Sequence, residues 1–464
     1  MYIKREIEST IDTMLTQGKV VLVTGARQVG KTTTLKHHLC DSFDYVSMEN
    51  PREYSLAKQD AVLFFESKNL PLIIDEIQRA PELFSPVKWI VDQSDEKGRI
   101  VLTGSQTYHL MKGVSESLAG RVRILEMPSL NLREIMNNAN NPHPYTPTKT
   151  TTKTLVKPVS ANEFKKDALS NSEQTKGCAS QQRDESTKQF ASRQSKEAKG
   201  LTLQQASRSS KSVASSTTSD LDIWSIIHRG SMPELQDSSV DWESFYTNYE
   251  SAYLERDVRD LINVKDEAKF YNFMVACAAR SGQLFNASEI GNVVGIDYKT
   301  VQSWLSVLQA SNIVRILEPF WPNIDKRLSK MPKIFFMDTG LLCHLTRWTT
   351  PDQLKNGAVA GHVFETFVVS EILKSYMNAG ANLRDVWFYR DSKKREIDLL
   401  IQNGHVLHPV EIKMAATVSA EAIKNFACLE KLSDYEVGFG HVVCQTREVY
   451  PITSNVQAVP VWAI

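Results

Sequence analysis

The chain has 464 residues, of which 42% are hydrophobic and 23% charged, and its formal net charge at pH 7 is zero. This length is enough for two to four domains, and the zero net charge confines any nucleic-acid-binding surface to a local patch. The six cysteines lack metal-ligand spacing, the first ten residues lack an apolar signal segment, and no apolar run approaches about 18 residues, so we expect a cytoplasmic chain that does not enter a membrane.

The first chemical motif is GARQVGKT at residues 25–32, which follows an apolar run at 20–23 and precedes a predicted helix. This is the P-loop (Walker A) pattern GxxxxGK[ST] in its strand–loop–helix context. Glycines allow backbone N–H groups to turn around phosphate oxygens, and the positive end of the following helix favours the anion. We expect Lys31 to reach the β- and γ-phosphates of ATP and Thr32 to ligate Mg²⁺. The predicted nucleotide-binding residues of this loop are Gly25, Ala26, Arg27, Gln28, Val29, Gly30, Lys31, Thr32 and Thr33.

A second apolar run, residues 70–74, ends in Asp75–Glu76 and has the form of a Walker B strand. Asp75 is expected to hold Mg²⁺ through water, and Glu76 to orient the attacking water. Together with the P-loop, these carboxylates predict an ATP-hydrolysing site in which Lys31 and Glu76 are catalytic.

A third run, residues 100–103, ends in Gly104–Ser105–Gln106. Ser105, which we add to the nucleotide-binding set, and Gln106 either sense the γ-phosphate and attacking water or merely end the strand with polar groups. Further along, Arg121 in SESLAGRVRILEM is either an arginine finger or a partner in a structural salt bridge. A finger can act within the chain or across a subunit boundary, and the second case requires a homo-oligomer.

Strand-like runs alternate with helical patterns, such as residues 81–93, throughout the segment 1–136. This alternation predicts a parallel sheet covered by helices, and we assign residues 1–136 to a P-loop ATPase domain. The strand-like runs are 20–23, 43–46, 70–74 and 100–102.

The composition changes abruptly at residue 137. Residues 137–220 are rich in Ser, Thr, Lys and Gln and have few apolar clusters, so they are predicted to form a disordered, low-complexity insertion. Aromatic residues at helical spacing resume within 221–266, which we assign to a helical lid or linker.

Residues 267–350 are predicted to form a winged helix-turn-helix. Ser288 is the expected N-cap of its second helix. The third helix either faces the major groove of DNA or packs as a lid on the ATPase. The expected elements are helices at 270–280, 287–294 and 297–311 and a wing strand at 313–317. The residues that would face DNA are Asp297, Tyr298, Lys299, Gln302 and Ser303.

The C-terminal segment 351–464 begins with an amphipathic helical pattern at 361–376, which contains Glu365. Asn403–Gly404 is a hairpin signal between two of the strands that follow. The predicted strands are 387–390, 396–401 and 406–413.

Charged residues recur at defined places in this hairpin. Period-two alternation places Glu411 and Lys413 on one face of the last strand, Asp398 lies on the strand that pairs with it, and the helix can bring in Glu365. Asp398 and Glu411 are therefore candidate Mg²⁺ ligands, and Lys413 would hold a water or a phosphate. The alternative is a set of charged residues on an exposed strand face.

Taken together, these segments resemble a widespread prokaryotic family of AAA-type P-loop ATPases, largely of unassigned function. Its members carry a C-terminal domain similar to PD-(D/E)xK nuclease folds. The matching pieces are GARQVGKT, LIIDEIQRAPELF, VLTGSQ, SESLAGR, HRGSMPE, AYLERDVRDL, FMDTGLL, GHVFETFVVSEI and FYRD…EIDLLI…HPVEIK.

The resemblance implies an α/β chain with a parallel-sheet P-loop (AAA/ASCE-type) ATPase domain, a winged helix-turn-helix and a C-terminal α/β restriction-endonuclease-like domain. It implies ATP and Mg²⁺ at the P-loop, Arg121 as the finger candidate, and a nuclease-like set that comprises Glu365, Asp398, Glu411 and Lys413. Two features depart from the family pattern: residues 137–220 exceed its usual length, and its "PD" step reads Ile397–Asp398.

The leading hypothesis is an ATPase that couples hydrolysis to the helix-turn-helix and to a nuclease-like module that acts on DNA. The alternative is a nucleotide-dependent binding switch whose nuclease-like domain is catalytically inactive. Whether that domain cleaves, and which DNA it would recognise, stay open at this point.

Overall fold

A five-stranded parallel sheet forms the N-terminal part of the computed structural model, which describes residues 2–104, 117–150, 222–253, 266–322 and 330–464. The strand order is β2-β3-β4-β1-β5, so β4 lies between the strand that leads into the P-loop and the strand that ends in Asp75. The predicted parallel-sheet P-loop fold is thereby confirmed. The strands are β1 (Val20–Thr24), β2 (Asp44–Ser47), β3 (Leu72–Asp75), β4 (Ile100–Gly104) and β5 (Val122–Glu126).

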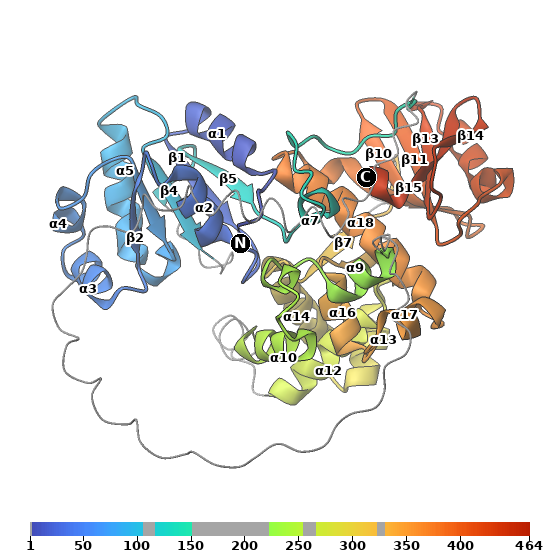
Figure 1. Cartoon of the computed structure of the whole chain (residues 1–464), viewed down its shortest axis with the longest axis horizontal. Helices are drawn as coiled ribbons and strands as arrows, with labels where there is room; N and C mark the ends of the chain where they lie inside the picture. The colour runs from blue at the N-terminus through green and yellow to red at the C-terminus, as the bar shows by residue number, and fades with distance from the viewer. Residues whose placement is uncertain (1, 105–116, 151–221, 254–265, 323–329) are drawn as a thin grey trace, which may run out of the picture. The chain divides into compact units, whose positions relative to one another are not determined.

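Helices cover both faces of this sheet (Figure 1). Helices α1 and α2 pack with Val21 and Val23 on one face, whereas α3, α4 and α5 pack with Val20 and Leu22 on the other. Strands buried on both faces read as continuous apolar runs, which is why they were recognisable in the sequence. The helices are α1 (Glu8–Gln17), α2 (Lys31–Leu39), α3 (Pro51–Gln59), α4 (Ala61–Glu66), α5 (Phe84–Asp92) and α7 (Leu132–Ile135).

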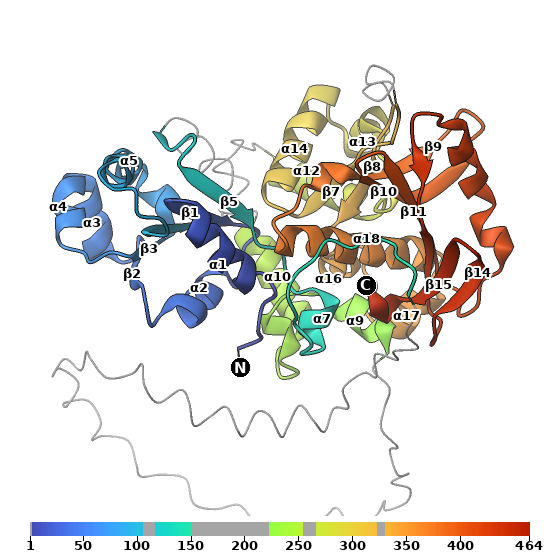
Figure 2. The same cartoon turned by 90° about the horizontal axis from the view of Figure 1, so that it is seen from above.

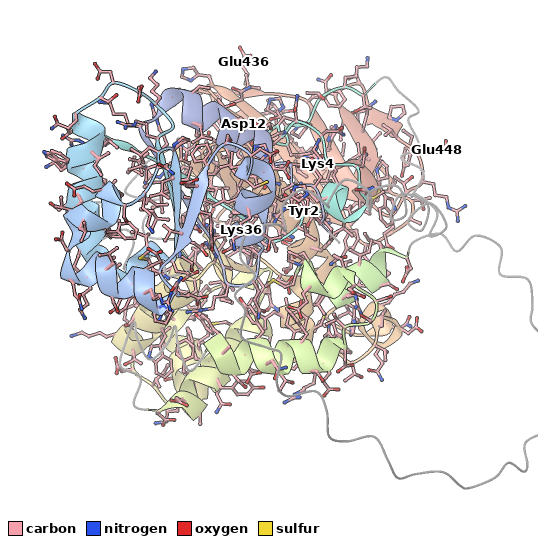
Figure 3. The ribbon with its side chains drawn as sticks, turned by 60° about the vertical axis from the view of Figure 1, so that its left-hand side comes forward. Tyr2, Lys4, Asp12, Lys36, Glu436 and Glu448 are labelled. Carbon is pink, nitrogen blue, oxygen red and sulfur yellow. The ribbon has the colours of Figure 1, made fainter. Side chains whose placement is uncertain are left out.

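The N-terminal segment is fastened to α2 by aromatic and polar contacts. Tyr2, labelled in Figure 3, stacks on His37 with 3.8 Å between ring centroids and donates a hydrogen bond of 2.5 Å to Glu8. On the same helix, the amine of Lys36 lies 3.8 Å from the ring centroid of Tyr45 on β2. These contacts hold α2, and thus the P-loop that precedes it, against the sheet.

The described residues between 222 and 352 are mainly helical. Strand β6 precedes helix α13 and strand β7 follows helix α14. Both strands pair with β8 in a small antiparallel sheet of order β6-β8-β7. The N-cap of α13 is Asn286, which accepts a hydrogen bond of 3.2 Å from the amide of Glu289, so the prediction of Ser288 as the cap was wrong by two residues. The elements are α9 (Ile223–Arg229), α10 (Trp242–Tyr253), α12 (Glu267–Ala278), β6 (Gln283–Leu284), α13 (Ala287–Val294), α14 (Tyr298–Ala310), β7 (Val314–Leu317), β8 (Lys333–Phe336), α16 (Thr339–Leu345) and α17 (Pro351–Asn356).

The C-terminal part is a mixed sheet of seven strands with the long helix α18 packed against β11 (Figure 2). The predicted hairpin is confirmed, because β10 and β11 pair antiparallel up to Asn403 and Val406 and Gly404 has φ +61°. Parallel pairing of β11 with β13 and of β13 with β15 extends the sheet beyond the three predicted strands. The elements are α18 (Ala360–Asn378), β9 (Val386–Arg390), β10 (Glu396–Asn403), β11 (Val406–Lys413), β12 (Glu436–Val437), β13 (Gly440–Cys444), β14 (Tyr450–Thr453) and β15 (Val456–Pro460).

The start of the predicted insertion has defined contacts in the structure. The amide of Tyr145 donates to the hydroxyl of Ser375 over 2.9 Å, and its own hydroxyl lies 2.6 Å from Nδ1 of His441. The amide of Thr150 donates to the side chain of Gln457 over 2.9 Å. Residues 141–150 therefore lie against the C-terminal sheet because an apolar ring and backbone groups find partners there, and the rest of the predicted insertion, from 151 on, lies outside the described residues.

Within the described part of the chain, no helix is both long and apolar enough to cross a membrane.

Candidate functional site

The P-loop adopts the backbone conformation that its glycines permit. Gly25 has φ +148° and Gly30 has φ +91°, and a Cβ at residue 25 would lie 2.2 Å from the carbonyl oxygen of Met127. A side chain at residue 25 would therefore collide with the backbone of Met127, directly after β5, so this position requires glycine. Gln28, at the turn of the loop, has φ +60° and its side chain is exposed.

Lys31 is folded back onto the loop. Its Nζ donates hydrogen bonds to the carbonyl oxygens of Gly25 (3.1 Å) and Ala26 (2.7 Å), and the residue is only 5% exposed. The amine is thus already positioned inside the loop, where phosphate oxygens of a nucleotide would take over from these carbonyls.

The back of the loop is fixed by Arg5, which sequence reasoning missed. Its guanidinium donates to the carbonyl oxygens of Val29 and Pro128, each over 2.8 Å, and pairs with Glu134 over 3.1 Å. All of these groups are buried. A buried guanidinium needs acceptors, and here two of them are backbone carbonyls behind the phosphate-binding loop and a third partner is the carboxylate of Glu134.

Asp75 lies where a metal bound to the nucleotide would need an oxygen ligand. The hydroxyl of Thr32 donates to its carboxylate oxygens over 3.0 and 3.1 Å, and the hydroxyl of Tyr45 donates over 2.7 Å. Burial and the neighbouring Asp75 raise the pKa of Tyr45 above its usual value, so Tyr45 remains a hydrogen-bond donor. A hydroxyl and a carboxylate in contact at the end of β3 fit the oxygen ligands that Mg²⁺ prefers.

Glu76 has φ +55°, a left-handed conformation that costs a residue other than glycine about 1–3 kcal/mol. The side-chain amide of Gln78 donates a hydrogen bond to its carboxylate. The left-handed turn directs Glu76 away from the path of β3, and Gln78 orients its carboxylate.

Thr103 on β4 is a polar residue that the sequence analysis did not single out. Ile74 pairs with Leu102 in the parallel register, so Thr103 lies beside Asp75. Its hydroxyl is fully buried and has no hydrogen-bond partner among the described residues. Ser105 and Gln106, the predicted sensors, lie outside the described residues.

The structure places Arg121 away from its own P-loop. It precedes β5, whose five residues run about 16 Å towards the P-loop edge, so Arg121 lies at the opposite edge of the sheet. Its Nε and Nη2 donate to the two carboxylate oxygens of Asp92 over 2.6 and 2.9 Å. This is the salt bridge that we weighed as an alternative, and the placement leaves a finger role only across a subunit boundary.

The second cluster of sequence-predicted residues comes together on α18, β10 and β11. Asp398 accepts a hydrogen bond of 2.8 Å from the amide of Ile412, and Nζ of Lys413 lies 2.6 Å from Oε1 of Glu411. The second oxygen of Glu411 is buried and has no hydrogen-bond partner among the described residues. Glu365 on α18 lies close enough to Asp398 for the negative charge of Asp398 to raise the pKa of Glu365.

Three charged residues of this cluster were missed, namely Lys333, Arg390 and Glu396. Nζ of Lys333, on β8, lies 2.8 Å from Oε1 of Glu365 and 2.6 Å from Oε1 of Glu396. The guanidinium of Arg390 pairs with the other oxygen of Glu396 over 2.5 Å. Arg390 and Glu396 lie within the piece FYRD…EIDLLI but were not singled out as site residues, whereas Lys333 lies outside every such piece and could be found only from the fold.

Electrostatics in the cluster reflect burial first and neighbouring charge second. Burial and the charge of Asp398 raise the pKa of Glu365 to about 7 and that of Glu411 to about 8. Burial also raises the pKa of Asp398. Burial alone would lower the pKa of Lys333, but Glu365, Asp398 and Glu396 outweigh it, so the pKa of this amine lies above its usual value.

The carboxylates of this cluster do not gather as a metal site. Over the described ranges, no group of three or more His, Cys, Asp and Glu side chains is arranged to hold a metal ion. The predicted ligands Asp398 and Glu411 instead face the amines of Lys333 and Lys413. The residues as they stand therefore do not fit a divalent cation, in contrast to Thr32 and Asp75.

The helix α14 presents a polar face beside a hollow. Asp297 caps the helix by accepting from the amides of Lys299 (2.8 Å) and Thr300 (3.0 Å), and the Thr300 hydroxyl holds the pKa of Asp297 below its usual value. Tyr298 is 57% exposed, and Lys299, Gln302 and Ser303 are also exposed. A cavity of about 490 Å³ is lined by residues of α13, α14 and β7 and by the approach to β8, among them Ser288, Tyr298, Gln302 and Lys330.

Comparison with family models divides the chain into three matched parts. Residues 17–136 match the family described as "AAA domain". Residues 220–352 and 360–464 match two families that are each described as "Domain of unknown function", DUF8612 and DUF4143 respectively.

Two curated proteins are similar to nearly the whole chain. They are described as "Uncharacterized protein Mb2031c" of Mycobacterium bovis and "Uncharacterized protein Rv2008c" of Mycobacterium tuberculosis. Each is 24% identical over 461 residues, which span 98% of this chain and 83% of the relative.

Among solved structures, the Walker-type ATPase PABY2304 of Pyrococcus abyssi is 14% identical, with a TM-score of 0.37, and the match covers 74% of this chain and 96% of that one. The RuvB Holliday junction branch migration motor of Thermotoga maritima is 13% identical, with a TM-score of 0.28, and the match covers 68% of this chain and 89% of that one. The P-loop, the parallel sheet and the matched family model agree, and residues 17–136 are an AAA-type P-loop ATPase domain.

Proposed function

We propose that this protein hydrolyses ATP at the P-loop and couples the hydrolysis to a winged helix-turn-helix and a nuclease-like C-terminal module that act on DNA. The observation that carries the proposal is the contact between Thr32 and Asp75 beside a Lys31 already seated in the loop. These three side chains are the ones that must meet for a nucleotide and its metal to bind together.

Each residue of the ATPase site has a role in this proposal. Lys31 holds phosphate oxygens, Thr32 and Asp75 would hold Mg²⁺, and Glu76 orients the attacking water. The metal, when bound, neutralises charge on the phosphates. Thr103 supplies a buried hydroxyl beside Asp75 that can bond to the attacking water or to the γ-phosphate. The chemistry of the chain's own residues is thus positioning and electrostatic stabilisation.

The DNA part of the proposal is supported by the exposed face of α14. Tyr298, Lys299, Gln302 and Ser303 are all accessible, and the cavity beside them is polar on several sides. A helix with exposed polar side chains, next to a small antiparallel sheet, is the arrangement that winged-helix proteins present to a major groove. Asp297 counts against the DNA part, because its exposed capping carboxylate stays ionised and would repel phosphate.

The decisive experiment measures ATP hydrolysis by the purified full chain with Mg²⁺, with and without plasmid and single-stranded DNA. Lys31→Ala and Glu76→Gln should each lower turnover by roughly 100-fold, which is about 2.7 kcal/mol of transition-state stabilisation. Lys58→Ala, at an exposed position of α3, is the matched control and should retain turnover. A turnover rate that rises when DNA is added supports the whole proposal. A turnover rate that is the same with and without DNA contradicts the DNA part of the proposal.

A second candidate is a nucleotide-dependent binding switch with an inactive nuclease-like domain. It is favoured by the amine of Lys333, which occupies the carboxylate cluster that a nuclease would need free. Under this alternative, ATP binds with little turnover, and plasmid stays intact with both the natural chain and Asp398→Asn. Cleavage that depends on Asp398 would exclude it.

A further inference from the structure

The amine of Lys333 lies within the C-terminal carboxylate cluster although the residue belongs to another part of the chain. Lys333 begins β8, whose partners are β6 and β7, whereas the carboxylates come from α18 and β10. Its side chain is 3% exposed, and its two ion pairs with Glu365 and Glu396 measure 2.8 and 2.6 Å. An amine this deeply buried is stable only because carboxylates surround it.

The arrangement of charges explains why the carboxylates can lie together. The negative charges of Glu365, Asp398 and Glu396 all raise the pKa of Lys333. These like charges would repel one another if no cation lay among them. Glu396 has a second partner in Arg390, and Asp398 also faces Lys413, but Lys333 is the cation that contacts both Glu365 and Glu396 directly. On the other side of the cluster, Lys413 forms an ion pair with Glu411.

We propose that Lys333 is a residue of the C-terminal carboxylate centre, contributed by β8, and that its ammonium group supplies the positive charge that a divalent cation would otherwise bring. This inference rests on the proposed function for the identity of the centre as nuclease-like. The centre is closed to divalent cations as long as β8 holds the amine between Glu365 and Glu396. It opens to them when β8 moves away or when the amine is removed.

On β8, only the side chain of Lys333 can close the centre to divalent cations in this way. The register places Lys333 opposite Leu317 on β7 and opposite Leu284 on β6, both without charge. The next residues of the strand, Ile334 and Phe335, are fully buried. Lys333 is therefore the one charged side chain of β8, and its amine meets the carboxylates of Glu365 and Glu396.

The test is the uptake of Mn²⁺ by the nucleotide-free full chain, measured as the loss of the free-ion signal in electron paramagnetic resonance. Lys333→Met should bind one additional Mn²⁺ per chain, at least about tenfold more tightly than the natural chain. Lys333→Arg keeps the charge and should behave as the natural chain does. Lys330→Met, three residues earlier and exposed, is the matched control and should also behave as the natural chain does.

The additional site must depend on the cluster itself. The double variant Lys333→Met with Asp398→Asn should lose the added Mn²⁺ uptake. Equal uptake by the natural chain and a folded Lys333→Met variant overturns the proposal, as does a natural chain that already binds Mn²⁺ in an Asp398-dependent manner. The Mn²⁺ measurement is made without ATP and does not depend on ATP hydrolysis. A failure of the ATPase assay would therefore count against the proposed function but would not change the interpretation of Mn²⁺ uptake.

Removal of the amine leaves buried carboxylates without a cation, and Lys333→Met can for this reason be poorly folded. Thermal unfolding resolves that case. Mn²⁺ should raise the unfolding temperature of Lys333→Met by several degrees and leave that of the natural chain unchanged. The variant Lys333→Met with Glu365→Gln, which removes one carboxylate together with the amine, should fold better and still take up Mn²⁺. An absence of any Mn²⁺ response in both variants overturns the proposal.

Discussion

The guanidinium group of Arg315 on β7 pairs with the carboxylate of Glu126, the last residue of β5. Glu126 is in register with Thr24, the residue that leads into the P-loop. Two residues after Arg315, Leu317 is in register with Lys333 on β8. The paired strands β7 and β8 thus contact the P-loop edge of the ATPase sheet through Arg315 and the C-terminal carboxylates through Lys333.

Replacement of Arg315 by Met should destabilise the chain by about 1–2 kcal/mol, because Glu126 then keeps a half-buried carboxylate without its partner. Glu126→Gln should cost less. Urea unfolding of both single variants and the double variant measures their coupling, and we expect up to about 1 kcal/mol for a pair whose side chains are only 24% and 26% exposed. Strict additivity of the two effects would show that the pair contributes no coupling.

Thr32 and Thr33 offer a matched pair within the P-loop helix. Thr32 contacts Asp75, whereas Thr33, which the sequence analysis also placed in the nucleotide-binding set, is exposed. Thr32→Ala should therefore lower Mg²⁺-dependent ATP turnover by at least roughly tenfold, or about 1.4 kcal/mol, and Thr33→Ala should change it less than about twofold. Steady-state kinetics over a range of Mg²⁺ concentrations checks this. An equal loss in both variants would contradict the assignment of Thr32 as the metal-side hydroxyl.

The buried hydroxyl of Thr103 should matter for turnover and not for folding. Thr103→Val keeps the shape of the side chain and removes a buried polar group that has no partner in the described residues, so the stability of the nucleotide-free protein should be equal or slightly higher. ATP turnover should nevertheless fall by roughly tenfold, since the hydroxyl would no longer bond to water or phosphate. Unchanged turnover in a folded variant would leave Thr103 a packing residue.

His441 makes stability depend on pH in a defined window. Burial lowers the pKa of His441 to about 4, although the carbonyl of Thr148 accepts from its Nε2 over 3.0 Å, and Tyr145 faces Nδ1. Between this pKa and the usual value near 6.5, the unfolded chain binds more protons than the folded one, so stability rises with pH across that window. The free energy lost on acidification should be about 2–3 kcal/mol.

Urea unfolding of the natural chain and of His441→Gln, at intervals from pH 4.5 to 7.5, measures this dependence. The difference in unfolding free energy between the two proteins should shrink as the pH falls, because the natural chain loses the contribution of its neutral histidine. A difference that stays constant over the whole range would mean that His441 does not titrate with unfolding.

Elements with a strong local signal could be predicted from the sequence. The P-loop and Asp75 follow buried strands, and the hairpin around Gly404 carries its own turn signal, so short-range chemistry was sufficient there. In each of these cases the information lay within about ten neighbouring residues. The alternation of the last strand also placed Glu411 and Lys413 on one face, whereas Glu365 reaches the cluster from a separate helix.

Residues whose role depends on a distant partner were missed. Lys333 looks like the start of an ordinary strand until Glu365 is placed beside it, and Arg5 has no motif although it supports the P-loop. Ser288 was expected to cap the second helix, but Asn286 does so, because residue type alone does not fix the exact start of a helix. Long-range contacts and exact helix ends are set by packing, which a single sequence does not display.

The junction at α7 has a consequence for synthesis of the chain. The amide of Leu132 donates to the carboxylate of Glu371, and Lys374 donates to the carbonyl of Leu130 over 2.9 Å. The amide and its partner are 239 residues apart, so at roughly 5–20 residues per second the ribosome needs about 10–50 seconds to supply the second half of the contact. Until α18 has emerged, the nascent ATPase domain must keep these backbone groups in water or on a chaperone, and a fragment that stops before α18 would remain permanently in that unfinished state.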